Sequence, residues 1–447
     1  MRIVFLPIDN RPVCYQLPKM IADINNGIEL IIPPIELLGD LTRQADITSL
    51  FEWLKSNINN SDALVLSLDT IAYGGLIPSR RSSEKFEEVL ARINNLKSLI
   101  KNTKAKIYAF SSIMRISNNN INQEEKIYWN LYGKKIFEYS YNYHKTGLTE
   151  TDIPTEIIED YLSTRKRNFE INKEYLKWYK SGLLNTLVFT KDDCAEYGLN
   201  VMEALELEKL GGYTRTGADE IPLTLLGRAI SETVKICPVF AEPNSKHLIS
   251  NYEDISIEES VKGQLNLAGC ELSDYDSADV ILYVNNFRKN QGEIVMKKTT
   301  ELFNKEWIPP EKSYIIADVR LANGADNNFV KQILEKSINQ NFLGFAAWNT
   351  SANTLGSLIC STKFILNAKT FKKFNEKAFN DLQIIRFLDD WAYQANVRQK
   401  LSEPDCKKIK LLMKGYEIQI KNLFSTDFNT EYSFPWNRLF EVKIELN

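Results

Sequence analysis

The stretch "IVFLPIDN", residues 3 to 10, joins an apolar, β-branched run to a polar end, and the fold follows from repetition of this pattern. An uninterrupted apolar run of this length is typical of a strand buried on both faces, as in parallel sheets. Asp9 and Asn10 then stand where the strand ends. Because open α/β sheets bind ligands at the carboxyl ends of their strands, this polar end is a first candidate for a functional site.

Eight further apolar runs repeat the pattern, each followed by a polar loop. They are residues 28–32, 63–68, 106–112, 186–190, 235–241, 279–284, 313–318 and 342–348. Helical patterns such as 84–101 and 326–338 alternate with them, which predicts an α/β fold with mostly parallel sheets and flanking helices. The number of strands favours two open, Rossmann-like lobes, and a distorted β/α barrel is the alternative.

The domain organisation follows from the spacing of these runs. We expect an N-terminal α/β lobe over residues 1–232, with a helical insertion at 120–180 that is rich in charge, tyrosine and tryptophan. A second α/β lobe should cover 233–366. The strand pattern stops there, so residues 367–447 are predicted to form a helical C-terminal segment.

Composition excludes several classes of protein. The 447 residues carry a formal net charge of −3, so no basic field attracts nucleic acid or anionic lipid. No apolar run approaches the ~20 residues that cross a membrane. The chain begins with a predicted strand rather than a signal peptide, and its six cysteines are scattered, so we expect a cytoplasmic protein without a disulfide framework.

Histidine is scarce, which narrows the chemistry. The only two, His144 and His247, stand in polar, helical surroundings. A Ser-His-Asp triad, a histidine-activated cysteine or a histidine-rich metal site therefore has little to work with. Acid–base catalysis would fall to aspartate, glutamate, tyrosine or lysine.

Polar side chains follow nearly every predicted strand. Any one of them has a simple explanation as a turn former or helix cap, and this applies especially to Asp193, Asp219 and Asp326. Their number favours a shared site along one edge of the sheet. The candidate catalytic carboxylates are Asp9, Asp69, Asp192, Asp193 and Asp318, and the candidate substrate-binding residues are Arg11, Tyr73, Gly74, Gly75, Arg80, Arg115, Tyr197, Asp219, Glu220, Arg320, Asn323, Asp326, Trp348, Asn349, Thr350 and Asn353.

Two of these segments have competing interpretations. In "DTIAYGGLIPSR" (69–80), Gly74 and Gly75 permit positive φ, but the spacing is neither that of a phosphate loop nor that of a dinucleotide fingerprint. Tyr73 and Arg80 could instead hydrogen-bond a polyhydroxylated ligand. In "WNTSANTLG" (348–356), the carboxamides either cap a helix beginning near residue 352 or bind ligand beside Trp348, whose ring could stack on a sugar.

Seven motifs together resemble an uncharacterised bacterial family, domain of unknown function 4127. They are "LPIDNRPV", "SLDTIAYGGLIPSR", "KDDCAEYG", "GADE", "ANGADN", "AAWNTSANTLG" and "FPWNRLF", and they run in the same order from residue 1 to about 445. The chain keeps the family pattern at Asp192, Asp193, Tyr197, Gly198, Trp348, Asn349, Thr350, Asn353, Thr354, Leu355 and Gly356, and it departs at Ala347, where glycine is usual. The resemblance implies no assigned reaction.

The residues themselves favour a hydrolase acting on a glycoside or a similar polyhydroxylated small molecule, without a cofactor. Two carboxyl groups suffice, about 5 Å apart for retention or ~6.5–9.5 Å apart for inversion. One of Asp192 and Asp193 would pair with Asp9, Asp69 or Asp318, and the drier member, with its raised pKa, would be the acid.

Two alternatives stay open. Clustered carboxylates and carboxamides also suit Mg²⁺ or Mn²⁺ in a metal-dependent hydrolase or lyase. The third possibility is a sugar or metabolite binder without catalysis. In each case the expected partner is a small molecule, neither nucleic acid nor a membrane.

Overall fold

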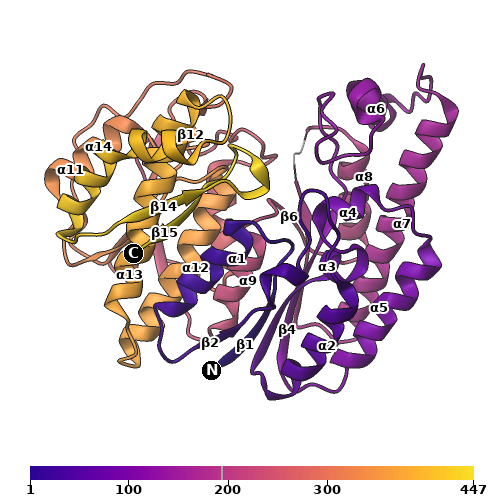
Figure 1. The fold of residues 1–447 in the computed structure, drawn as a ribbon, viewed down its shortest axis with the longest axis horizontal. Coiled ribbons are helices and arrows are strands. Elements are labelled where there is room, and N and C mark those ends of the chain that lie inside the picture. Colours follow the sequence, from indigo (N-terminus) through magenta and orange to yellow (C-terminus); the bar gives the residue numbers. More distant parts are fainter. Residues whose placement is uncertain (193–194) are drawn as a thin grey trace. The chain divides into compact units, whose positions relative to one another are not determined.

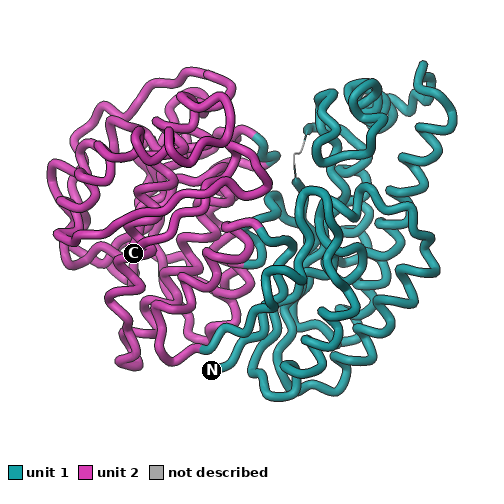
Figure 2. The backbone as a smooth tube through the Cα atoms, viewed as in Figure 1, with its two compact units in different colours: residues 1–10, 29–222, 252–254 teal, residues 11–28, 223–251, 255–447 magenta. Residues whose placement is uncertain are grey.

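The computed structural model describes residues 1–192 and 195–447. This part of the chain divides into two compact units (Figure 2). Unit 1 consists of Met1–Asn10, Glu29–Pro222 and Tyr252–Asp254, and unit 2 consists of Arg11–Ile28, Leu223–Asn251 and Ile255–Asn447.

Unit 1 is built on a parallel sheet of six strands in the order β2-β1-β3-β4-β5-β6. The strands are β1 (Arg2–Leu6), β2 (Glu29–Ile31), β3 (Ala63–Ser67), β4 (Lys106–Ile113), β5 (Thr186–Lys191) and β6 (Thr214–Thr216). The chain leaves β1 toward β2 on one side and returns to β3 on the other. The order therefore reverses between β1 and β3, where doubly wound sheets have their ligand crevice.

Helices pack against this sheet (Figure 1). In α5, Val89, Ile93, Leu96 and Ile100 recur at helical spacing, and all four are buried. The helices of this part of the chain are α2 (Ile47–Asn57), α3 (Leu68–Tyr73), α4 (Leu76–Arg81), α5 (Phe86–Ile100), α6 (Trp129–Thr146), α7 (Thr155–Lys180), α8 (Leu199–Lys209) and α9 (Ile221–Ala229), which continues into unit 2.

The predicted helical insertion has its own small core. Helices α6 and α7 occupy most of residues 120–180, and Trp129 and Ile136 of α6 cluster with Tyr161 of α7. The Trp129 and Tyr161 rings lie 6.0 Å apart between centroids. The aromatic residues of this segment therefore hold the insertion together.

Unit 2 contains a five-stranded parallel sheet in the order β13-β11-β9-β7-β8, which reverses between β7 and β9. Its strands are β7 (Lys235–Phe240), β8 (Glu271–Leu272), β9 (Val280–Asn285), β11 (Tyr314–Asp318) and β13 (Phe342–Ala346). Two short pairs accompany it, β10 (Gly292–Glu293) with β12 (Leu321–Ala322) and β14 (Thr430–Ser433) with β15 (Lys443–Leu446).

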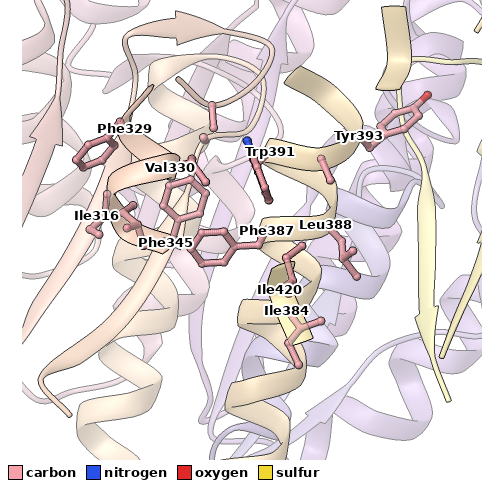
Figure 3. Close-up of a cluster of buried hydrophobic side chains, with 14 of the residues drawn as sticks. Ile316, Phe329, Val330, Phe345, Ile384, Phe387, Leu388, Trp391, Tyr393 and Ile420 are labelled. Atoms are coloured by element: carbon pink, nitrogen blue, oxygen red, sulfur yellow. The ribbon is translucent and has the colours of Figure 1, made fainter. Parts of the chain in front are cut away.

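Unit 2 also holds the C-terminal helices. Its helices are α1 (Pro12–Asp23), α10 (Ile257–Leu267), α11 (Asn327–Lys336), α12 (Ser351–Thr370), α13 (Glu376–Arg386), a π-helix (Phe387–Val397) and α14 (Cys406–Phe424). Figure 3 shows the buried cluster in which Phe387 and Trp391 of the π-helix lie near Phe345 of β13. Phe345 of β13 stacks on Phe387 of the π-helix with ring centroids 4.5 Å apart. The C-terminal segment is thus part of the core of unit 2.

The structure confirms the predicted fold class, and each of the nine predicted strands is present. Both main sheets are open within residues 1–192 and 195–447, so the barrel alternative is wrong. The expectation of no strand beyond residue 366 is also wrong, because β14 and β15 form an antiparallel pair. In the described residues, every helix is too short or too polar to span a bilayer.

Candidate functional site

Two candidate carboxylates flank the point at which the sheet of unit 1 reverses its order. Asp9 follows β1 and Asp69 follows β3, the two neighbouring strands at the reversal. Both side chains are buried, with 4% and 1% of the residue exposed. They therefore stand at the edge where a doubly wound sheet binds its ligand.

Asp69 is held by the end of the adjacent strand β4. Its Oδ2 accepts a hydrogen bond from the Ser112 backbone N–H at 2.8 Å, and Oδ1 accepts one from Ser111 Oγ at 3.4 Å. Burial raises the pKa of Asp69 to about 6, although these hydrogen bonds and the charge of Arg80 oppose the rise. A carboxyl group with this pKa can hold a proton in mildly acidic solution and release it near neutrality.

Asp192, at the end of β5, belongs to a partly buried cluster of ionic groups. Its Oδ2 lies 3.3 Å from Arg80 Nη2 and 3.3 Å from Arg115 Nη1. The same two arginines meet Glu125, with Arg80 Nη1 at 3.5 Å and Arg115 Nε at 3.0 Å from Oε1. Glu124 Oε2 completes the cluster, 2.8 Å from Arg115 Nη2. Two guanidiniums thus join three carboxylates, an arrangement that places every buried charge beside an opposite one.

The glycine pair of "DTIAYGGLIPSR" explains how Arg80 reaches this cluster. Gly74 ends α3 in the left-handed region at φ 85°, and Gly75 has φ 130°. A side-chain carbon on Gly75 would lie 3.0 Å from the Ile8 carbonyl oxygen, beside the end of β1. The predicted positive φ is confirmed at both glycines, and the turn brings α4, with Arg80, against the edge of the sheet.

The two tyrosines of the candidate set have packing roles in unit 1. The Tyr73 ring is buried beneath the Arg167 guanidinium, 5.1 Å from its centroid, and burial raises the pKa of its hydroxyl. Tyr197 packs edge-on against the rings of Tyr141 and His144 of α6, each 5.3 Å away. These contacts fix both rings, and a role in substrate binding stays a prediction for each.

Asp219 and Glu220 follow β6 at the start of α9 and are buried. An ideal side-chain carbon on Gly217 would lie 1.7 Å from Glu220 Oε1, and Gly217 has φ 105°. The Glu220 carboxylate therefore rests against the bare backbone of Gly217, a close approach that needs glycine. Near the same strand end, Asp254 forms an ion pair with Lys191 and accepts a hydrogen bond from Thr216.

In unit 2, Arg320 connects the ends of three strands. Nε lies 3.1 Å from Oδ1 of Asn285, the last residue of β9, and Nη2 lies 3.3 Å from Glu242 Oε1 after β7. Asp318, at the end of β11, accepts hydrogen bonds from Asn285 Nδ2 at 2.8 Å and the Asp326 N–H at 2.7 Å. Burial and the neighbouring Asp326 charge raise the pKa of Asp318 to about 7.

Asp326 has a further contact that accounts for its position. It caps α11, as its oxygen accepts a hydrogen bond from the Asn328 N–H. The predicted cap is confirmed. The carboxylates Asp318 and Asp326 therefore organise the loops of unit 2, and a catalytic role for Asp318 stays a prediction.

The segment "WNTSANTLG" caps a helix, as one of its two interpretations requires. The Thr350 hydroxyl accepts a hydrogen bond from the Asn353 N–H at the start of α12. Asn349 has φ 57°, and its carbonyl accepts a hydrogen bond from the Asn323 N–H at 2.8 Å. Trp348 is buried and lines a pocket of about 40 Å³, and no contact in this structure tests its interaction with a ligand. Sugar stacking by Trp348 therefore stays a prediction.

Arg11 and Asn323 are placed by other contacts of unit 2. Arg11 follows β1 in the sequence but belongs to unit 2, where Nη1 lies 3.5 Å from Glu441 Oε1. Asn323 has φ 61°, and its Nδ2 donates to Glu293 Oε1 at 2.5 Å. The position of Arg11 and Asn323 after predicted strands did not indicate their partners, Glu441 and Glu293.

The sequence reasoning did not select Glu124, Glu125, Ser111 or Ser112. The two glutamates lie in the polar run "NNNINQEEK", where no hydrophobic period marks a structural position. The sequence feature that could have indicated them is the position of this acidic pair, nine and ten residues after Arg115. Asp193, a predicted catalytic residue, lies outside the described residues. Helix α8 itself has Gly198 at its N-cap position.

The part of the chain that the structure describes contains no preformed cluster of metal-binding side chains. Within residues 1–192 and 195–447, no group of three or more histidine, cysteine, aspartate or glutamate side chains is placed to hold an ion. The carboxylates of the Asp192 cluster instead face guanidiniums.

A comparison to protein families tests the resemblance drawn from these motifs. The model of a family described as a protein of unknown function (DUF4127) matches residues 3–445. The chain belongs to this family. The match confirms the resemblance drawn from the seven motifs, and it places the Asp192 cluster and the Arg320 contacts inside the DUF4127 region. No match was found among curated proteins or among solved structures.

Proposed function

We propose that the protein is a hydrolase acting on a glycoside or a similar polyhydroxylated small molecule, with its active site at the carboxyl edge of the unit 1 sheet. The observation that supports this most is the contrast between two carboxylates near one arginine. Asp69 is buried with a pKa raised to about 6, and the charge of Arg80 acts on it. Asp192 forms an ion pair with that same Arg80.

These environments suggest different roles. Asp69, the drier group, would donate a proton to the leaving group, because a carboxyl group with a raised pKa is a better acid near neutrality. Asp192 would act as general base or nucleophile. Its side chain is 26% exposed, so solvent or substrate can reach it.

The arginines would position the second carboxylate. Arg80 and Arg115 hold Asp192 Oδ2 from two directions at 3.3 Å each, which fixes the carboxylate without covalent support. Preorganised charges of this kind favour a transition state that carries opposite charge. Asp9, buried at the neighbouring strand end, is the third carboxylate that could contact substrate.

The proposal can be tested with a panel of chromogenic glycosides and the variants Asp69→Asn and Asp192→Asn. Each variant should lower kcat/KM by at least a hundredfold, since general acid–base catalysis contributes about 10²–10⁴-fold. Asp160→Asn is the matched control, because Asp160 is also an ion-paired carboxylate of unit 1, bound to Lys126 and Tyr128. Equal activity in all three variants would contradict the proposal.

The same assay separates the two alternatives. Activity lost with a chelator and restored by Mg²⁺ or Mn²⁺ would favour the metal-dependent hydrolase or lyase. A sugar that binds saturably and is recovered unchanged after long incubation would favour a binding protein. Retention or inversion of the anomeric centre would then report the spacing of the two carboxyl groups.

A further inference from the structure

Helix α14 of unit 2 has one face in the core and the opposite face in solvent (Figure 1). Ile409, Met413 and Ile420 are buried in the hydrophobic cluster of unit 2. Leu411 and Ile418 lie on the opposite face and are 66% and 60% exposed. They are about two helical turns apart, so they lie one above the other. We call this pair the aliphatic centre of the exposed face.

Lysines flank the aliphatic centre on both sides. At about 3.6 residues per turn, Lys407, Lys410 and Lys414 fall on one side of it. Lys408 falls on the other. All four are exposed, and within residues 1–192 and 195–447 none of their ammonium groups is paired with a carboxylate. We call these four lysines together with the aliphatic centre the lysine face.

The acidic groups of this region leave the lysine face positively charged. Glu417, the single acidic residue of α14, accepts hydrogen bonds from two hydroxyls of β14, each at 2.6 Å. Asp405 caps the helix, and its carboxylate accepts two backbone N–H groups at 2.9 Å. Asp427, beyond the helix, is ion-paired with a lysine of the last turn. The exposed Glu403 precedes the helix, and four lysines outnumber it.

We propose that the lysine face binds the surface of an anionic lipid bilayer. Lysines on an amphipathic helix attract anionic headgroups, and their stems extend beside aliphatic side chains that enter the boundary of the acyl chains. Protein–protein interfaces, by contrast, are depleted in lysine and enriched in arginine and aromatic residues. The lysine face contains no arginine and no aromatic ring, so its composition fits a lipid surface better than an acidic protein.

The net charge of −3 led to the opposite expectation for anionic lipid. That sum covers the whole surface, whereas a bilayer attracts charges within a Debye length of ~8–10 Å. A local group of lysines is therefore not visible in it. The proposal concerns unit 2 and does not rest on hydrolysis in unit 1.

The test is co-sedimentation of the intact protein with phosphatidylcholine vesicles, prepared with and without phosphatidylglycerol. We expect binding only where phosphatidylglycerol is present, and loss of that binding at high salt. The double variant Lys410→Gln, Lys414→Gln should weaken it about tenfold, because two of the four charges are removed. The double variant Leu411→Ser, Ile418→Ser should also weaken it, at unchanged charge.

Two controls match these variants. Lys331→Gln with Lys336→Gln makes the same charge change on α11, where both lysines are ion-paired with glutamates. Ile308→Ser removes an aliphatic side chain of unit 2 that is 71% exposed but lies outside α14. Both control proteins should bind the anionic vesicles as the unchanged protein does.

No binding to the anionic vesicles overturns the proposal, as does equal binding to both kinds of vesicle. Anionic binding that the lysine variant of α14 retains in full also overturns it, because the contact then lies elsewhere. Capture by immobilised polyglutamate without vesicle binding would assign the lysine face to an acidic polypeptide instead. All substituted side chains are exposed, and thermal denaturation of each variant checks that it folds. Absence of glycosidase activity would leave these measurements unaffected, so the two proposals fail separately.

Discussion

Arg80 Nη2 lies 3.3 Å from Asp192 Oδ2, although 112 positions separate the two residues along the chain. The Arg80 side chain is 1% exposed and that of its second partner, Glu125, is 3% exposed. The pair therefore forms inside unit 1, and the fold of the sheet brings it together. Removing either member would leave the other with fewer opposite charges beside it, Glu125 for Arg80 and Arg115 for Asp192.

Arg80→Gln should lower the free energy of unfolding by about 3–5 kcal/mol, because it leaves Glu125 and Asp192 with one guanidinium in place of two. Urea denaturation measures the change. Arg43→Gln is the control, since Arg43 and Asp40 form an exposed pair with side chains 50% and 25% exposed. The control should lose less than about 1 kcal/mol. Similar losses in the two variants would contradict a buried cluster.

Asp69 should make the stability of the protein depend on pH. Its pKa is raised from 3.8 to about 6 in the folded state, so the folded protein binds more protons than the unfolded chain between these values. The contribution is present below pH 4 and is lost as the pH rises through about 6. A difference of this size corresponds to about 3 kcal/mol.

The measurement compares the unchanged protein with Asp69→Asn by urea denaturation at pH 4, 5, 6 and 7. Other carboxyl groups contribute equally to both proteins and cancel. The difference in unfolding free energy should shift in favour of the variant by about 3 kcal/mol as the pH rises. A difference that stays constant across this range would show that Asp69 is not buried as described. If Asp69 is also the catalytic acid, kcat/KM should fall above pH 6.

The nine main strands could be predicted because long, apolar, β-branched runs mark strands buried on both faces. β14 and β15 were missed because the tail hairpin has the opposite pattern. In β14, Thr430 and Tyr432 are buried whereas Glu431 and Ser433 are exposed. This period of two is typical of a strand with one face in solvent, and a search for continuous apolar runs passes over it.

The site was only partly predictable for a related reason. Asp69 and Asp192 could be selected from the sequence because each stands where a predicted strand ends. Glu125 reaches Arg115 through a loop without periodic pattern, so no local signal gave its partner. Arg11 pairs with Glu441, 430 residues away, and such a contact depends on the complete fold of unit 2.

Arg320→Lys tests the contacts that connect the strand ends of unit 2. The guanidinium donates to Asn285 Oδ1, Glu242 Oε1 and the Glu301 carbonyl, and a single ammonium group cannot reach all three acceptors in this geometry. We expect a loss of about 1–3 kcal/mol in the free energy of unfolding, as buried acceptors lose their donors. Arg288→Lys is the control, because the Arg288 side chain is 44% exposed. A loss no larger than that of the control would contradict the connecting role.

Gly217→Ala tests whether the Glu220 carboxylate depends on a bare backbone. Two costs combine, because the alanine would have to adopt φ 105° and its side-chain carbon would overlap Glu220 Oε1. Gly147→Ala separates them. Gly147 also has positive φ, at 75°, but a side-chain carbon there would have nothing within 4 Å. Gly147→Ala should therefore lower the free energy of unfolding only by the backbone strain, about 1–2 kcal/mol. Gly217→Ala should lower it clearly more in thermal or urea denaturation.

If Glu220 contacts substrate, Gly217→Ala should also lower kcat/KM while Gly147→Ala leaves it unchanged. Equal stability of the two variants would mean that Glu220 moves aside without cost, and its buried position would then need no glycine.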